Sequence, residues 1–319
     1  MTHDALIGHS GFVGGTLNRQ HSFSAKFNSA NIDTIAEQSF DTVVCAAAPG
    51  SMVIANRQPE RDRAAIEALT DQLDRVRARR FVLISSIAVL ADFAGGEDEG
   101  TQAFQENLAY GRHRRLLEAF CESRFDDCLV VRLPALFGKG LRKNFVFDLM
   151  NPVPTMLPQE RLAALAERMS SDLRTRLKEL YSPDETTGML RLDRPALNAD
   201  PKRASLDRAV HEAEMSATQF HNPDTTYQYY DMTRLWQDIG MAMQAELRHL
   251  HLAVAPLRAA DIHARLLQSP MMQTGAKIHH EDMRTRHAAL WQRDGPYLED
   301  ASTVLENLAT FFAEQRPVE

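Results

Sequence analysis

The sequence has 319 residues, of which 44% are hydrophobic and 25% charged, which suits a water-soluble protein of one large domain or two lobes around a cleft. A net charge of −7 without a lysine or arginine run argues against a nucleic-acid binder. No long apolar run or leader-like N-terminus suggests a membrane protein, and three cysteines without metal-ligand spacing favour a reduced, cytoplasmic setting.

A glycine-rich turn follows the first apolar run, Ala5-Leu6-Ile7. Gly8, Gly11 and Gly14 have the spacing G-x-x-G-x-x-G. Glycines at such positions allow a tight turn from strand to helix and let backbone N–H groups approach a pyrophosphate at the helix N-terminus. The motif predicts a dinucleotide site, and a glycine-rich turn without a ligand is the alternative.

Strands and helices alternate through the N-terminal half. We expect strands over 22–27, 41–45, 81–84 and 128–131, and helices over 12–19, 32–39, 59–80 and 110–123. Because helices separate successive strands, this order predicts a doubly wound parallel sheet of Rossmann type.

Small or polar side chains follow three of these strands. The strand over 22–27 runs into Asn28 without an acidic residue, which leaves NAD and NADP open with a lean to NADP. Ala46-Ala47-Ala48 would let a flat cofactor lie against the backbone, although such residues also serve close packing. Ser85 and Ser86 stand at a carboxyl strand end, where open α/β sheets bind ligands.

The C-terminal half reads as mostly helical. We expect helices over 157–180, 233–246 and 302–314, strands over 227–231 and 249–252, and a capping segment over 183–203. The predicted fold is therefore α/β, with a Rossmann domain over residues 1–150, completed by 225–254. A smaller, mostly helical substrate-binding lobe is expected over 151–224 and 255–319.

Several of these features together resemble the extended short-chain dehydrogenase/reductases, which include nucleotide-sugar epimerases, dehydratases and reductases. They are the glycine turn, Ser85-Ser86, Tyr110-x-x-x-Arg114 and the segment 132–138. The resemblance covers residues 1 to about 150 well and is faint over 227–261. It implies an NAD(P)-dependent oxidoreductase or epimerase that acts on a hydroxyl or carbonyl of a sugar-like or nucleotide-linked substrate. It also implies a homodimer that pairs through the Tyr110 helix and the preceding helix.

The resemblance gives three residues catalytic roles. Ser86 would orient the substrate oxygen, and Tyr110 would exchange a proton with it. A cation four residues after the tyrosine normally lowers the pKa of the phenol and holds the nicotinamide ribose. The family usually has lysine there, whereas this chain has Arg114, with a planar guanidinium that is always charged.

Further residues are candidates for binding the substrate or the cofactor. Candidate substrate residues are Ala88, Leu136, Lys143 and Asn144, and the last two could bind an anion such as a diphosphate or be ordinary surface residues. No metal site is expected, because neighbouring residues of the ligand-rich stretch 279–282 point apart. The candidate cofactor residues are Gly8, Ser10, Gly11, Phe12, Val13, Gly14, Asn28, Ala46, Ala47, Ala48, Tyr110, Arg114 and Pro134.

Some positions depart from the family's pattern. Ile87-Ala88 replace the Asp-Glu pair of sugar-nucleotide 4,6-dehydratases, so that activity is not expected. Leu90 stands where a tyrosine is usual, and Ala135 where an asparagine usually meets the substrate. With Arg114, these departures support an alternative function, a redox-silent dinucleotide-binding regulatory or interaction protein on the same fold.

Overall fold

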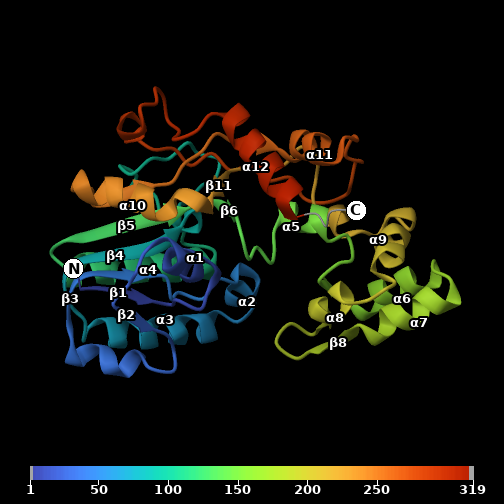
Figure 1. Ribbon diagram of the computed structural model, residues 1–319, viewed down its shortest axis with the longest axis horizontal. Coiled ribbons are helices and arrows are strands. Elements are labelled where there is room, and N and C mark those ends of the chain that lie inside the picture. The colour runs from blue at the N-terminus through green and yellow to red at the C-terminus, as the bar shows by residue number, and fades with distance from the viewer. Residues whose placement is uncertain (1–2, 316–319) are drawn as a thin grey trace. The chain divides into compact units, whose positions relative to one another are not determined.

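The computed structural model describes residues 3–315, so residues 1–2 and 316–319 of the predicted domain ranges lie outside the described part. The described chain divides into two compact units, and Figure 1 labels their elements. The sheet unit comprises the described residues up to Leu141, Thr226–Leu257 and His280–Phe311. The helical unit comprises Arg142–Thr225, Arg258–His279 and the described residues from Phe312.

The sheet unit is built on a six-stranded sheet in which every neighbouring pair is parallel. The strand order is β12-β5-β4-β3-β1-β2, and the position of β1 beside both β2 and β3 makes the sheet doubly wound. The predicted Rossmann-type α/β fold is therefore confirmed. The strands are β1 (Asp4–Ile7), β2 (Ala25–Phe27), β3 (Ser39–Cys45), β4 (Arg77–Ser86), β5 (Cys128–Leu133) and β12 (His249–His251).

Helices cover both faces of this sheet (Figure 1). They are α1 (Phe12–Gln20), α3 (Pro59–Leu73), α4 (Ala109–Arg124) and α10 (Leu235–Gln244). Two further helices are α2 (Met52–Arg57) and α12 (Ala301–Gln315). Short 3-10 turns are η1 (Ile32–Glu37), η2 (Ile87–Val89), η4 (Met232–Arg234) and η5 (Ala288–Trp291). The remaining strands are β6 (Ala135–Phe137), β10 (Thr226–Tyr227), β11 (Tyr229–Asp231) and β13 (Leu257–Arg258).

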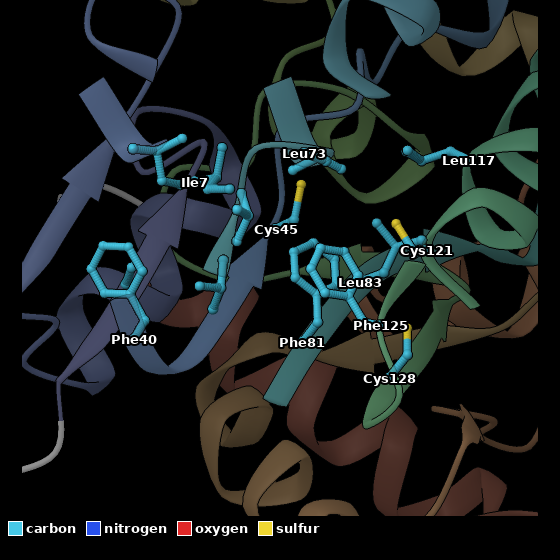
Figure 2. Packing of buried hydrophobic residues seen from close by; sticks show 14 of the residues in the cluster. Ile7, Phe40, Cys45, Leu73, Phe81, Leu83, Leu117, Cys121, Phe125 and Cys128 are labelled. Carbon is cyan, nitrogen blue, oxygen red and sulfur yellow. The ribbon is translucent and has the colours of Figure 1, made fainter. Parts of the chain in front are cut away.

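The core of the sheet unit lies between the strands and the pair α3 and α4. Phe81 of β4 stacks on Phe125 with ring centroids 4.1 Å apart (Figure 2). All three cysteines are free and buried in this region. Burial raises the pKa of the Cys45 thiol to about 11 and that of Cys128 to about 12, so both are neutral core side chains.

The predicted helix over 59–80 is wrong in its second part. The helix α3 ends at Leu73, and β4 begins at Arg77, where it pairs with Ser39 of β3. Arg77, Arg79 and Arg80 therefore lie on a strand rather than in a helix, and Arg80 forms an ion pair with Asp127 at 2.6 Å. Pairing with β3 offers the backbone a ladder that an isolated helix end lacks.

Other boundaries also differ from the prediction. The stretch over 227–231 forms two short strands outside the main sheet, and β11 pairs instead with β6. Residues 280–311 belong to the sheet unit, whereas the sequence assigned them to the capping lobe. Gln228 explains that difference, because its side-chain amide is bonded to the backbone N–H and C=O of Met283 at 2.7 and 2.8 Å.

The helical unit has its own core of leucines and valines around Leu165, Leu177 and Leu206. The predicted single helix over 157–180 is two helices, α6 (Gln159–Glu167) and α7 (Ser171–Glu179). The other elements of the unit are α5 (Phe145–Met150), β7 (Met156–Leu157), β8 (Tyr181–Asp184), β9 (Met189–Leu192), α8 (Arg194–Asn198), α9 (Arg203–Glu212), η3 (Ala217–Phe220) and α11 (Ala259–Leu267). Among residues 3–315, no helix is both long and apolar enough to cross a membrane.

Candidate functional site

The glycine turn joins the end of β1 to the first residue of α1. Gly8 has φ of +88°, and its backbone N–H donates to the carbonyl of Phe27 at the end of β2. Gly11 occupies the N-cap position of α1 with no side-chain cap. The first backbone N–H groups of α1 therefore receive no hydrogen bond from a capping side chain. An uncapped helix N-terminus of this kind suits an anion.

Packing inside the protein leaves no room for a side chain at two of the three motif glycines. A Cβ on Gly8 would lie 2.6 Å from the carbonyl oxygen of Ala46, and one on Gly14 would lie 2.1 Å from that of Gly8. A Cβ on Gly11 would meet its nearest neighbour at 3.5 Å, an ordinary van der Waals distance. The protein's own packing therefore explains why Gly8 and Gly14 are glycines, but it does not explain Gly11. A ligand that approaches the backbone would explain Gly11.

Three strand ends meet at this turn. The backbone N–H of Ala46, directly after β3, donates to the carbonyl of Ile7, and Asn28 directly follows the Phe27 carbonyl that binds Gly8. Ala46, Ala47 and Ala48 are all partly buried. The structure thus brings together the predicted cofactor residues of the glycine turn, of β2 and of β3 at one edge of the sheet.

Ser86 and Tyr110 come together at the same carboxyl edge, because Ser86 ends β4 and Tyr110 lies in the first turn of α4. The Ser86 side chain interacts with the Tyr110 hydroxyl and lowers the pKa of the phenol. Two features place α4 for this contact. The side-chain oxygen of Asn56 accepts from the Tyr110 backbone N–H at 3.0 Å. Gly111 lets the helix pack directly on η2, since a Cβ there would lie 1.9 Å from the carbonyl oxygen of Ala88.

Arg114 lies one helical turn after Tyr110, with its guanidinium carbon 4.0 Å from the centroid of the Tyr110 ring. The side chain is almost fully buried, with 3% of its surface exposed. Its Nη1 donates to Asp62 of α3 at 2.5 Å, and its Nη2 donates to the carbonyl of Pro49. His113 binds the same Asp62 oxygen at 2.8 Å. Within the described chain, Arg114 Nε is buried without a hydrogen-bond partner.

The net pKa shift of Tyr110 differs from the expectation. Burial raises the pKa of the phenol above its ordinary value and is the largest effect. The charge of Arg114 lowers the pKa, as does the neighbouring Ser86 side chain, whereas the charge of Asp62 raises it. Arg114 therefore lowers the pKa of the phenol as the sequence predicts, but burial outweighs the cation and the net shift is upward.

A buried network of charged side chains connects α4 to the ends of the neighbouring strands. Glu118 of α4 is fully buried and accepts from Ser85 Oγ at 2.6 Å. Arg132 of β5 donates two hydrogen bonds to the same carboxylate, at 3.0 and 2.7 Å, and its Nη1 lies 3.0 Å from His251. Burial lowers the pKa of His251 to about 4, so its ring is neutral at neutral pH. The network ties α4 to β4, β5 and β12.

The remaining candidate residues are placed as follows. Pro134 and Leu136 follow β5, in which Leu133 pairs with Ser86. Ala88 is buried in η2 beneath Gly111. Lys143 and Asn144 belong to the helical unit, where the Asn144 side chain caps α5 by accepting from the backbone N–H of Phe147 at 3.0 Å.

Several residues of this site were not found from the sequence. Asp62 is one of them, although it stands four residues before Ile66 on the apolar side of its helix, and an acid at such a position is a detectable signal. Gly111 gave a second signal, because a glycine inside a helix costs stability unless close packing needs it. Asn56 gave none.

Comparisons with known proteins support the fold. No family model and no curated protein matches the sequence. A dTDP-4-dehydrorhamnose reductase from Bacillus anthracis, solved with NADP, is 13% identical over 99% of both chains with a TM-score of 0.62. A UDP-galactose 4-epimerase is 13% identical with a TM-score of 0.59, covering 98% of this chain and 99% of its own. MoeE5, solved with UDP-glucose and NAD, is also 13% identical, over 98% of both chains, with a TM-score of 0.59. The chain shares their fold.

Proposed function

We propose that this protein is an NAD(P)-dependent oxidoreductase or epimerase of the extended short-chain type, acting on a hydroxyl or carbonyl of a sugar-like or nucleotide-linked substrate. The observation that carries the proposal is the pairing of Ser86 and Tyr110 at the carboxyl edge of the sheet that also holds the glycine turn. The structural neighbours support it, since their names describe a nucleotide-sugar reductase and epimerase and one holds UDP-glucose with NAD.

The site residues divide the chemistry among them. A nicotinamide, when bound, supplies or accepts a hydride at the substrate carbon. Tyr110 gives a proton to the substrate oxygen or takes one from it, and Ser86 orients that oxygen by a hydrogen bond. Arg114 places a positive charge on the face of the Tyr110 ring. Asp62 and Pro49 use two of the five N–H donors of Arg114, so a contact with the cofactor ribose would fall to the remaining donors, among them the unpartnered Nε.

We propose NAD or NADP as the cofactor, with a lean to NADP. The residues that would hold its pyrophosphate are the glycine turn and the start of α1, where Gly11 leaves the backbone accessible. The end of β2 would meet the adenosine ribose, and Lys26, Asn28 and Ser29 provide no acid there to repel a 2′-phosphate. The homodimer and the cytoplasmic location stay predictions of the sequence.

Two matched glycine substitutions test cofactor binding. Gly11→Ala should lower the affinity for NADPH and NADH by about tenfold or more, because the new methyl group occupies the space of the pyrophosphate. Gly15→Ala is the control, since its Cβ would also meet only ordinary contacts, at 3.6 Å and beyond, but lies within α1. Isothermal calorimetry and thermal shift with each dinucleotide measure the effect. Equal affinities of the two variants would contradict the proposed turn, and no binding by the unaltered chain would contradict the cofactor itself.

The second candidate function is a redox-silent dinucleotide-binding regulatory or interaction protein. The hydrogen bonds from Arg114 to Asp62 and to the Pro49 carbonyl favour it. They hold the guanidinium in place, whereas a lysine ammonium at this position would be a mobile point charge. Arg114→Lys distinguishes the two functions when hydride transfer from NADPH or NADH to keto-sugar nucleotides is followed by absorbance. Activity that appears only in the variant would support the redox-silent protein, whereas activity lost in the variant would show that the arginine serves the enzyme.

A further inference from the structure

The charge of Arg114 is compensated inside the protein. The Asp62 carboxylate of α3 forms an ion pair with Arg114 Nη1 at 2.5 Å. Both side chains are nearly inaccessible, with 4% of the Asp62 side chain and 3% of the Arg114 side chain exposed. The same Asp62 oxygen also hydrogen-bonds to His113 Nδ1 at 2.8 Å, so one carboxylate oxygen holds two neighbouring residues of α4. A buried guanidinium without an anion would be costly, and the ion pair is therefore a fixed part of this packing.

The same pair fixes where the guanidinium lies relative to Tyr110. With Nη1 on Asp62 and Nη2 on the Pro49 carbonyl, the group is held from two sides. Its carbon then lies 4.0 Å from the ring centroid, against the ring face. The charged groups that act on Tyr110 are consequently Arg114 from α4 and Asp62 from α3, with the neutral Ser86 hydroxyl contributed by β4.

We propose that Asp62 is a positioning residue of this site: it holds Arg114 against the Tyr110 ring and compensates its charge, so that Tyr110 enters the reaction as a protonated acid. The inference rests on the proposed function and deepens it. In the direction that this state favours, Tyr110 Oη gives its proton to the oxygen of a substrate carbonyl while the carbonyl carbon receives a hydride from the reduced nicotinamide. The C=O group becomes C–OH, and Tyr110 regains a proton from water.

The electrostatics of Tyr110 agree with this role. Burial is the largest effect and raises the pKa of the phenol, and the anion on Asp62 raises it further. Removal of the Asp62 charge leaves Arg114 uncompensated, and an uncompensated cation favours phenolate. The sign of the expected change is therefore a lower pKa of Tyr110.

The test is a titration of Tyr110 in the whole protein without cofactor or substrate. The chain has six tyrosines, so NMR with carbon-labelled tyrosine resolves them, and Tyr110→Phe identifies the Tyr110 signal. Asp62→Asn should move its titration to lower pH by about 1 unit or more. Asp71→Asn, which removes an exposed carboxylate from the same helix, is the matched control and should leave the titration unchanged.

Two further variants separate charge from packing. Asp62→Asn combined with Arg114→Gln removes both charges, and Tyr110 should then titrate within about half a unit of the unaltered chain. Asp62→Glu keeps the anion and should do the same. If Asp62→Asn alone does not fold, as judged by circular dichroism, Asp62→Glu still tests the proposal, because a titration lowered by a unit in that variant would overturn it.

The proposal is overturned if Asp62→Asn leaves the Tyr110 titration unchanged or raises it, or if Asp62→Glu lowers it by a unit. A shift in the double variant as large as in Asp62→Asn would also overturn it, since the uncompensated cation would then not be the cause. Because no cofactor takes part, these outcomes are independent of the dinucleotide-binding test with Gly11→Ala. Either proposal can fail while the other stands.

Discussion

Replacement of Tyr110 by phenylalanine should lower turnover by about 10²–10⁴-fold, the range that proton transfer by a positioned side chain contributes. The change removes one hydroxyl, which is the group that the Ser86 side chain acts on. The ring stays and continues to support the Arg114 guanidinium at 4.0 Å. Affinity for the dinucleotide should therefore change little, because the glycine turn and the strand ends that would bind it are untouched.

The measurement is NADPH or NADH oxidation with a panel of keto-sugar nucleotides, together with calorimetry of dinucleotide binding. Tyr297→Phe is the control, since it removes a tyrosine hydroxyl of the sheet unit that binds Asp282 rather than Ser86. Turnover should be lost in Tyr110→Phe and kept in Tyr297→Phe. Undiminished turnover in Tyr110→Phe would remove Tyr110 from the mechanism and with it the proposed enzyme.

Local patterns predicted the parts of this protein that depend on neighbouring residues in the chain. The spacing of Gly8, Gly11 and Gly14 after an apolar run located the first strand, the turn and α1, because backbone sterics at these positions are local. The alternation of strands and helices gave the parallel sheet. Ser86 and Tyr110 were found through a family resemblance, and the structure brings their side chains together.

Features that depend on contacts between distant segments could not be predicted in this way. Asp62 and Arg114 are 52 positions apart, and nothing in the spacing of either segment shows that α3 and α4 place them in contact. The end of α3 at Leu73 was missed for a related reason. The arginines that follow it suit a helix C-terminus, and only the ladder with β3 makes them part of a strand. Long-range pairing overrides local preference at such places.

The buried network around Glu118 predicts the largest loss of stability. Glu118→Gln keeps the size of the side chain but leaves Arg132, which is 1% exposed, without its anion. Breaking a buried ion pair from one side typically costs about 3–5 kcal/mol, and this carboxylate also serves Ser85. The free energy of unfolding, measured with urea at an unchanged m-value, should fall by that amount.

Glu122→Gln makes the same chemical change one turn later on α4, at a side chain that is 27% exposed and paired with Arg115 and His249. Its loss should be about 1 kcal/mol or less, because water can replace the missing interactions. Equal losses of unfolding free energy in Glu118→Gln and Glu122→Gln would contradict the proposed stabilising role of the buried network. Glu118→Leu combined with Arg132→Met should recover most of the loss, since no buried charge is then left without a partner. Such recovery, with the contact between Ser86 and Tyr110 kept, would show that the charges act on stability while the proposed catalytic pair depends on the packing of α4 through Gly111.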